Sequence, residues 1–342
     1  MSRSTPPHPT DLPAWMGRHY VGIDENGMGP RLGPMVVTSI LAEVSGDESA
    51  RLMICAARGA LAKRIGDSKK LISYDDNALG EAWARAIVTR ADRAAATPRE
   101  LLGSIMLDGE NTLRDGCPSH HAELCWGTDG EGFTAPNDLV RTCDNDLVRL
   151  EDRGVRVLRA RVAIVCTRRL NDAVVRGLSR FDLDLHTMER LVLAARGDAN
   201  AEIYAICGKV GGFHFYGDRF GPLADRPRTT LIEGRARSEY EVPDVGRLAF
   251  VRDADDSHAI VALASLVGKW VRDHFMRRIV RYHQMRAPHL PNVSGYHDPV
   301  TAHFIEASAL VRKAQCIEDA CFERISRGRK TTSSMKGKAP AR

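Results

Sequence analysis

The chain has 342 residues, of which 43% are hydrophobic and 27% are charged, and its formal net charge at pH 7 is +5. This length and composition allow a full hydrophobic core, in one large domain or in one domain that carries an insertion. No run of twenty apolar residues occurs and the N-terminus lacks the apolar core of a signal peptide, so we expect a soluble, cytoplasmic protein that does not enter a membrane.

Local patterns predict a mixed α/β protein. Residues 20–23 and 35–41 read as short buried strands joined by a glycine-rich turn. The elements predicted after them are a helix over 76–96, a loop-like stretch over 97–152, a strand over 156–165, a helix over 171–195 and a strand over 201–207. This order suits a mixed sheet flanked by helices.

Composition divides the chain into a core and two ends. Residues 1–17 are expected to form a flexible leader, and residues 327–342 a basic disordered tail. The domain between them spans 18–326, with an irregular insertion over 97–152 and a helical C-terminal part over 274–326. A monomer is the default expectation.

Two adjacent acids, Asp24 and Glu25, stand at the end of the first predicted strand. Charged groups in such a place rarely serve packing, although an isolated pair also fits a surface hairpin in which glycines merely permit the turn. Carboxylates from separate segments that meet at a sheet edge are the ligands that Mg²⁺ or Mn²⁺ prefers. Because two adjacent residues cannot surround an ion alone, this pair would need acids from other segments to form a metal site.

Four segments, in order along the chain, resemble the signature motifs of ribonuclease HII, the type 2 ribonuclease H family. They are D-E-N-G-M-G-P-R-L-G-P from Asp24, D-S-K-K-L at 67–71, D-D-S-H-A-I-V-A-L-A-S-L-V-G-K-W-V-R-D at 255–273, and S-G-Y-H-D-P at 294–299. Between these segments the resemblance is weak. It implies a ribonuclease H-like mixed sheet and hydrolysis of the RNA strand of RNA/DNA hybrids, or of ribonucleotide-containing duplexes, with Mg²⁺ or Mn²⁺.

The resemblance also implies metal ligands. Asp24 corresponds to the central bridging acid, Glu25 to its neighbour, and Asp255 to the acid that begins the helix running past Lys269. Asp253 and Asp256 lie nearby, so the choice of Asp255 rests on the register of this motif. Alternatively, Asp255 only caps that helix and complements its dipole. The family's fourth acid ends a central strand, where this chain has Gly208, so Asp218 is the candidate that replaces it.

Substrate contacts follow from the same motifs. The implied set is Gly27, Met28, Gly29, Lys69, Lys70 and Tyr296. Met28 stands where the family has an arginine and cannot donate a hydrogen bond, a loss for which Arg31 is a candidate compensator. Tyr296 corresponds to a tyrosine that stacks on a nucleotide. In isolation, the two lysines also fit a solvated surface, and Tyr296 fits a half-buried loop aromatic.

The eight cysteines are scattered, which favours reduced thiols over a disulfide framework. Cys117, His120, His121 and Cys125, with Cys143 further on, have spacings at which a structural Zn²⁺ would order the irregular insertion. Unliganded loop residues are the alternative, because paired C-x-x-C motifs are missing.

Three functions fit these observations. The first is a ribonuclease HII-like endonuclease. The second is a nucleic-acid-binding protein without catalysis, indicated by Met28 and Gly208. The third is a metal-dependent nuclease with another substrate on the same fold.

Overall fold

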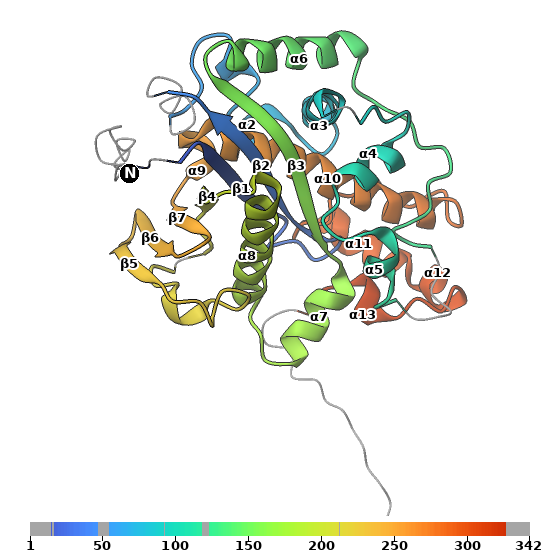
Figure 1. Cartoon of the computed structure of the whole chain (residues 1–342). Coiled ribbons are helices and arrows are strands. Elements are labelled where there is room, and N and C mark those ends of the chain that lie inside the picture. The colour runs from blue at the N-terminus through green and yellow to red at the C-terminus, as the bar shows by residue number, and fades with distance from the viewer. Residues whose placement is uncertain are drawn as a thin grey trace, which may run out of the picture.

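The computed structural model describes residues 15, 17–46, 55–91, 93–117, 123–211 and 213–325. The tail and most of the leader expected from the sequence lie outside these residues. Seven strands of the described chain form one sheet in the order β3-β2-β1-β4-β7-β6-β5 (Figure 1). Their bounds are β1 His19–Asn26, β2 Met35–Val44, β3 Val155–Val165, β4 Ile203–Gly208, β5 Thr229–Glu233, β6 Arg237–Val242 and β7 Gly246–Val251.

The sheet is mixed, as predicted. The β1, β2 and β3 strands pair antiparallel, and so do β5, β6 and β7. The β4 strand lies parallel to both β1 and β7. Because parallel strands end at the same edge of a sheet, the C-terminal ends of β1, β4 and β7 meet there. These three ends carry Asp24, Gly208 and the segment that leads to Asp255.

Helices cover both faces of the sheet (Figure 1). The α-helices are α2 Ser68–Leu71, α3 Ala78–Arg90, α4 Pro98–Ile105, α5 Glu110–Arg114, α6 Asn137–Glu151, α7 Thr167–Val175, α8 Arg180–Ala199, α9 Ala254–Ser257, α10 Ala259–Gln284, α11 Pro299–Ala307, α12 Ala309–Ala314 and α13 Asp319–Phe322. Two short 3₁₀ helices are η2 Leu61–Lys63 and η3 Gly217–Arg219. The α10 helix packs on one face together with α3, and α8 packs on the other.

Alternation along β1 decides which face each side chain meets. Tyr20 belongs to the core under α10, whereas Val21 and Ile23 belong to the core under α8. Gly22 faces α10 so closely that a Cβ at this position would lie 2.4 Å from the Ile260 carbonyl carbon. The absence of a side chain at Gly22 therefore lets the start of α10 rest directly on β1.

Two predicted elements differ from the structure. The stretch 97–152, expected to be irregular, contains α4, α5 and α6. The α6 helix buries Cys143, Leu147 and Leu150 on one stripe that its many charged neighbours conceal in the sequence. The helix expected over 171–195 is two helices, because Gly177 takes a φ of +85° and Ser179 begins α8 with a capping box.

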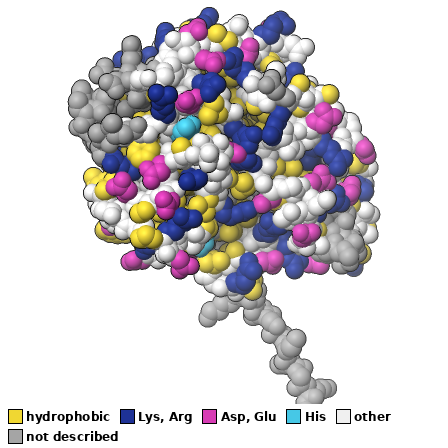
Figure 2. Space-filling model, viewed as in Figure 1, with side chains coloured by type: hydrophobic (Ala, Val, Ile, Leu, Met, Phe, Trp, Pro, Cys, Tyr) yellow, Lys and Arg dark blue, Asp and Glu magenta, His cyan; other side chains and the backbone are white. Residues whose placement is uncertain are grey.

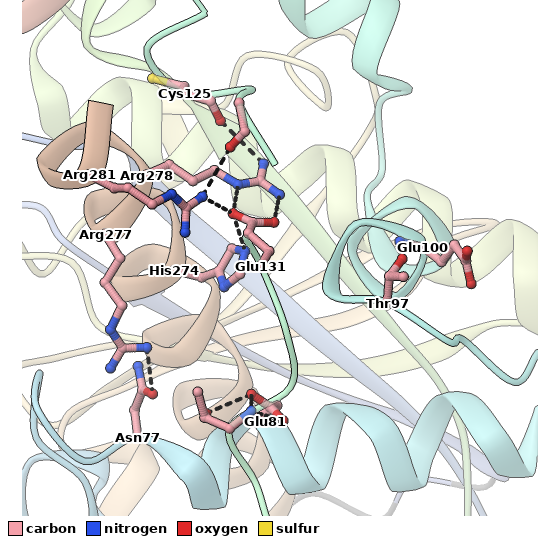
Figure 3. Close-up of polar contacts among 12 residues, drawn as sticks. Asn77, Glu81, Thr97, Glu100, Cys125, Glu131, His274, Arg277, Arg278 and Arg281 are labelled. Atoms are coloured by element: carbon pink, nitrogen blue, oxygen red, sulfur yellow. Dashed lines mark hydrogen bonds and ion pairs between the residues drawn. The ribbon is translucent and has the colours of Figure 1, made fainter. Parts of the chain in front are cut away.

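A buried carboxylate fastens the 97–152 stretch to α10 (Figure 3). Glu131 accepts hydrogen bonds from Arg278 Nε at 2.6 Å and from Arg281 Nη2 at 2.8 Å, and its Oε1 lies 3.2 Å from His274 Nε2. Burial alone would raise the pKa of Glu131, but the hydrogen bonds from Arg278 and His274 outweigh it and hold this pKa below its ordinary range. Glu131 thus links three cationic or polar side chains of one helix.

On the face seen in Figure 2, Lys and Arg side chains are interspersed with acidic ones. The modest net charge of +5 is therefore not gathered into one block on this face. None of the described helices is long and apolar enough to span a bilayer.

Candidate functional site

The first acid, Asp24, sits near the C-terminal end of β1 on the α10 face, and Glu25 follows it on the α8 face. Burial raises the pKa of Asp24 well above its ordinary value, and the charge of Asp255 raises it further. A hydrogen bond from the Ser265 hydroxyl of α10 acts in the opposite direction. The structure therefore brings Asp24 and Asp255 within electrostatic reach of each other.

The sequence predicts that Asp255 begins the long helix α10, but the structure places it before that helix. It lies in the single turn α9, and extended backbone at His258 separates this turn from α10. Asp253, in front of the turn, has a left-handed φ of +52°. Burial raises the pKa of Asp255, and the charge of Asp67 raises it further. Because the helix is interrupted at His258, α9 and α10 can run in different directions. The α10 helix packs on β1, and α9 carries Asp255 at the edge of the sheet.

The segment 67–71 reaches the same place. Asp67 caps α2 by accepting from the Lys69 backbone amide at 2.9 Å. The Ser68 hydroxyl lies 2.9 Å from the Ser265 hydroxyl, and Lys70 Nζ lies 3.2 Å from Asp256. Both Lys69 and Lys70 are exposed. This motif thus places Lys69 and Lys70 at the solvent-exposed edge of the site, which we call the rim, next to the acids.

The segment 294–299 packs against the glycine-rich turn and against Arg272 of α10. The carbonyl of Gly295 accepts from the Arg31 and Leu32 amides at 2.8 and 3.1 Å. The guanidinium of Arg272 donates to the Ser294 carbonyl at 2.7 Å and lies 4.6 Å from the centre of the Tyr296 ring. Tyr296 itself is 46% exposed. Its ring is therefore positioned by a cation–π contact while part of it faces solvent.

The glycine-rich turn has the shape that the sequence predicts. Gly27 has a φ of +96°, and a Cβ there would lie 2.9 Å from the Arg272 side chain. Gly29 is exposed, and a Cβ there would meet nothing within 4 Å. Met28 packs its side chain partly against the core under α8. Arg31 pairs with Glu323 at 2.7 Å, so the structure engages Arg31 in an ion pair.

A buried arginine holds this turn from beneath. Arg324 donates to the carbonyls of Gly27 at 2.5 Å and Gly33 at 2.8 Å. Burial lowers the pKa of Arg324 to about 9. Burial raises the pKa of Glu25 to about 7, although the Arg324 charge opposes this rise. No motif identifies Arg324 in the sequence, because it follows the last recognisable segment.

The strand position expected to hold a fourth acid is empty of a side chain. Ile23 pairs with Cys207, so Gly208 lies beside Asp24 at the end of β4. A Cβ at Gly208 would lie 2.8 Å from Asp24 Oδ1. The structure does not bring Asp218 there, because this residue is exposed in η3, beyond the end of β4.

A different acid, missed in the sequence, lies within electrostatic reach of the pair. Asp184 of α8 is fully buried, and the charges of Glu25 and Asp24 add to the effect of burial in raising its pKa. It stands between Phe181 and Met188 on the stripe of α8 that packs on the sheet. A carboxylate in this apolar register was the signal that could have identified it.

These residues fit a hard cation by their chemistry. Among the described residues, Glu25 Oε1 and both carboxylate oxygens of Asp184 are buried and have no hydrogen-bond partner. Oxygen atoms of this kind are ligands for Mg²⁺ or Mn²⁺. In the present arrangement, however, no three His, Cys, Asp or Glu side chains of the described residues are placed to hold an ion. Cation binding therefore requires the carboxylates to turn toward one another.

The zinc expectation gains no support. His120 and His121 lie outside the described residues. Cys117 and Cys125 line one cavity of about 30 Å³ with Cys166 and Cys321, whereas Cys143 packs elsewhere in the core under α10. Burial raises the pKa of both Cys117 and Cys125, which favours protonated thiols.

No protein-family model and no curated protein match the sequence. Among solved structures, the chain is similar to the RNase HII of Archaeoglobus fulgidus in its complex with PCNA, with 16% identity over 92% of this chain and 98% of that chain and a TM-score of 0.40. It is similar to Bst-RNase HIII in complex with Mn²⁺, with 12% identity over 90% of this chain and 67% of that chain and a TM-score of 0.44. It is also similar to the ribonuclease H2 from Pyrococcus horikoshii OT3, with 16% identity over 89% and 92% of the two chains and a TM-score of 0.35. Each similarity concerns the course of the backbone, and none assigns a reaction to this chain.

Proposed function

We propose that this chain is a ribonuclease HII-like endonuclease that cleaves the RNA strand of RNA/DNA hybrids or of duplexes containing ribonucleotides. The observation that carries the proposal is the convergence of four segments that lie far apart in the sequence. Ser68 contacts Ser265, Lys70 pairs with Asp256, and Gly295 accepts from the backbone at Arg31. Unrelated surface loops have no reason to gather acids, lysines and an exposed aromatic around one strand end.

In this proposal, Asp24, Glu25 and Asp255 hold Mg²⁺ or Mn²⁺. The bound cations would activate a water molecule and stabilise the leaving oxygen of the phosphodiester. Burial raises the pKa of all three acids, because ionised carboxylates are costly there without a cation. The pair Asp24 and Glu25 lies on opposite faces of β1, so each acid serves a different side of the strand end.

The substrate would lie over the glycine turn and the rim. Gly29 leaves open space in which a backbone amide can approach a phosphate. Lys69 and Lys70 are exposed and suited to phosphate contacts, and the exposed part of Tyr296 is suited to stacking. Met28 cannot replace the donor of an arginine, so recognition of the 2′-hydroxyl falls to backbone groups.

A second function, hybrid binding without cleavage, is favoured by one observation. Position 208 has no carboxylate beside Asp24, and a site with one acid fewer binds its second cation weakly. Cleavage separates the two functions.

The test uses labelled duplexes with one embedded ribonucleotide, with an RNA tract, or with DNA alone, each with Mg²⁺ and with Mn²⁺. The endonuclease requires metal-dependent cuts in the ribonucleotide-containing strands that disappear in Asp24→Asn. Binding of the duplexes without any cut would favour the second function. Cuts in the all-DNA duplex would point to a nuclease with another substrate.

A further inference from the structure

Among the described residues, the buried carboxylate of Asp184 has no hydrogen-bond donor or cation paired with it. It is 0% exposed, and among the described residues neither of its oxygens has a hydrogen-bond partner. The charges that act most strongly on it, Glu25 and Asp24, are both negative. A buried polar group without partners costs roughly 1–3 kcal/mol and an unpaired charge costs more, so an acid kept purely for packing would be a poor choice in α8.

Protonation alone does not satisfy this group. A protonated Asp184 would lose its charge, but its carbonyl oxygen would still have no donor among the described residues. A cation placed between Asp184 and Glu25 would instead engage the oxygens of both, including the unpartnered Glu25 Oε1. The missing partner has the chemistry of a hard divalent ion.

Gly208 supplies the second observation. A Cβ at position 208 would lie 2.8 Å from Asp24 Oδ1, so a carboxylate on β4 would enter the site from the α10 face. Cys207, next to Gly208, points to the other face; burial raises the pKa of its thiol, and the charge of Asp184 raises it further. Asp184 therefore approaches the same strand end from the α8 face.

We propose that Asp184 is a ligand of the divalent cation and supplies, from helix α8, the carboxylate that the strand lacks at Gly208. This inference rests on the proposed function and names a residue that no motif assigns. Cation binding draws Asp184 and Glu25 together with Asp24, and the repulsion among the three acids is relieved when the ion enters.

Glu189 offers a matched control on the same helix. It is also a buried acid, and burial raises its pKa to about 7. Unlike Asp184, it is fully engaged, because it accepts from the Gly221 amide at 3.1 Å and from the Leu223 amide at 2.8 Å. Its role is to hold the loop after β4, so Glu189→Gln should change stability without changing metal affinity.

The test is calorimetric titration of the full chain with MnCl₂, combined with melting curves in the absence of metal. Because even outer partners of metal ligands are worth 10- to 100-fold in affinity, Asp184→Asn should weaken Mn²⁺ binding by at least about tenfold. The same variant should melt at an equal or higher temperature without metal, since it removes a buried acid from two others. The double variant with Asp184→Asn and Gly208→Asp should regain binding, because it returns a carboxylate to Asp24.

Each result decides something. Unchanged Mn²⁺ affinity in Asp184→Asn overturns this inference and leaves the proposed function standing. A lower melting temperature without metal, together with no recovery in the double variant, shows that Asp184 supports the fold instead. A parent protein that binds no Mn²⁺ overturns the proposed function, and this inference fails with it.

Discussion

The hydroxyl oxygens of Ser68 and Ser265 lie 2.9 Å apart, although 197 positions separate the two residues in the chain. The Ser265 hydroxyl also lies close enough to the Asp24 carboxylate to lower its pKa. One short contact therefore couples the lysine-bearing α2 to the acid on β1 through the helix between them. Changes in any of these three elements are expected to be felt at the site.

Metal affinity and stability should depend on pH in opposite ways through Glu25. Its pKa is raised to about 7 by burial, so the folded state holds this proton over the window from about 4.3, the ordinary value of Glu, to about 7. Between these values the unfolded state binds fewer protons, and metal-free stability falls as pH rises. Mn²⁺ needs the ionised form, so its affinity should increase as pH rises through about 7. Melting curves and Mn²⁺ titrations from pH 5 to 8 measure both trends, and Glu25→Gln should flatten them. If stability and Mn²⁺ affinity change with pH as steeply in Glu25→Gln as in the parent protein, Glu25 is not the group responsible.

Replacing Arg324 should collapse the glycine turn. Arg324→Met leaves the buried carbonyl of Gly27 without this donor and that of Gly33 with only the 3.4 Å hydrogen bond from Thr167 Oγ1, and an unsatisfied buried group costs about 1–3 kcal/mol. We expect a loss of roughly 3 kcal/mol in the free energy of unfolding, measured by denaturant titration. Arg31→Gln is the control, because it breaks only the partly exposed pair with Glu323 and should cost less than about 1 kcal/mol. Equal costs for the two variants would argue against a special role of Arg324.

Glu131→Gln should loosen the 97–152 stretch from α10. The substitution leaves Arg278 and Arg281 without their carboxylate, and loss of one partner from a buried ion pair typically costs about 3–5 kcal/mol. Relative to the parent protein, amide hydrogen exchange in the variant should accelerate more in α4, α5 and α6 than in β1 or β2. Glu123→Gln, which removes an exposed partner of Arg114, should leave exchange unchanged. Uniformly faster exchange across the sheet would mean that Glu131 stabilises the whole domain.

Lys69→Gln should weaken hybrid binding in a salt-dependent way. If Lys69 contacts one phosphate, its loss should reduce the slope of log affinity against log salt concentration by roughly 1. Fluorescence anisotropy at several salt concentrations measures this slope. Lys313→Gln, an exposed change in α12, serves as the control. A slope that stays the same in Lys69→Gln would remove this residue from the interface.

Much of the framework follows from the sequence because its signals are local. The short apolar runs that begin at Tyr20 and Met35 predict β1 and β2, and the turn needs glycine where Gly27 takes a positive φ. The short motifs also indicate which segments gather at the site. Local periodicity fails where charge hides an apolar stripe, as in α6, and where a capping box at Ser179 divides one predicted helix into two.

The rest depends on contacts that no local pattern encodes. Asp184 shares the apolar stripe of α8, but only the fold brings it within electrostatic reach of Glu25. Asp218 is close to Gly208 in sequence, yet β4 ends before it and the chain carries it to the surface. Position along the chain therefore pointed to Asp218, whereas burial on α8 is the reason why we propose Asp184.

Arg324 is also among the last described residues to be synthesised, whereas the turn that it holds is among the first. Chains grow on the ribosome at about 5–20 residues per second, so the carbonyls of Gly27 and Gly33 wait for their donor while 297 and 291 further positions, respectively, are translated. A nascent chain can form β1 and β2 early, but it cannot yet fix the loop between them. A chain that terminates just before Arg324 would consequently lack the donor that holds the turn between β1 and β2, at the sheet edge that carries Asp24.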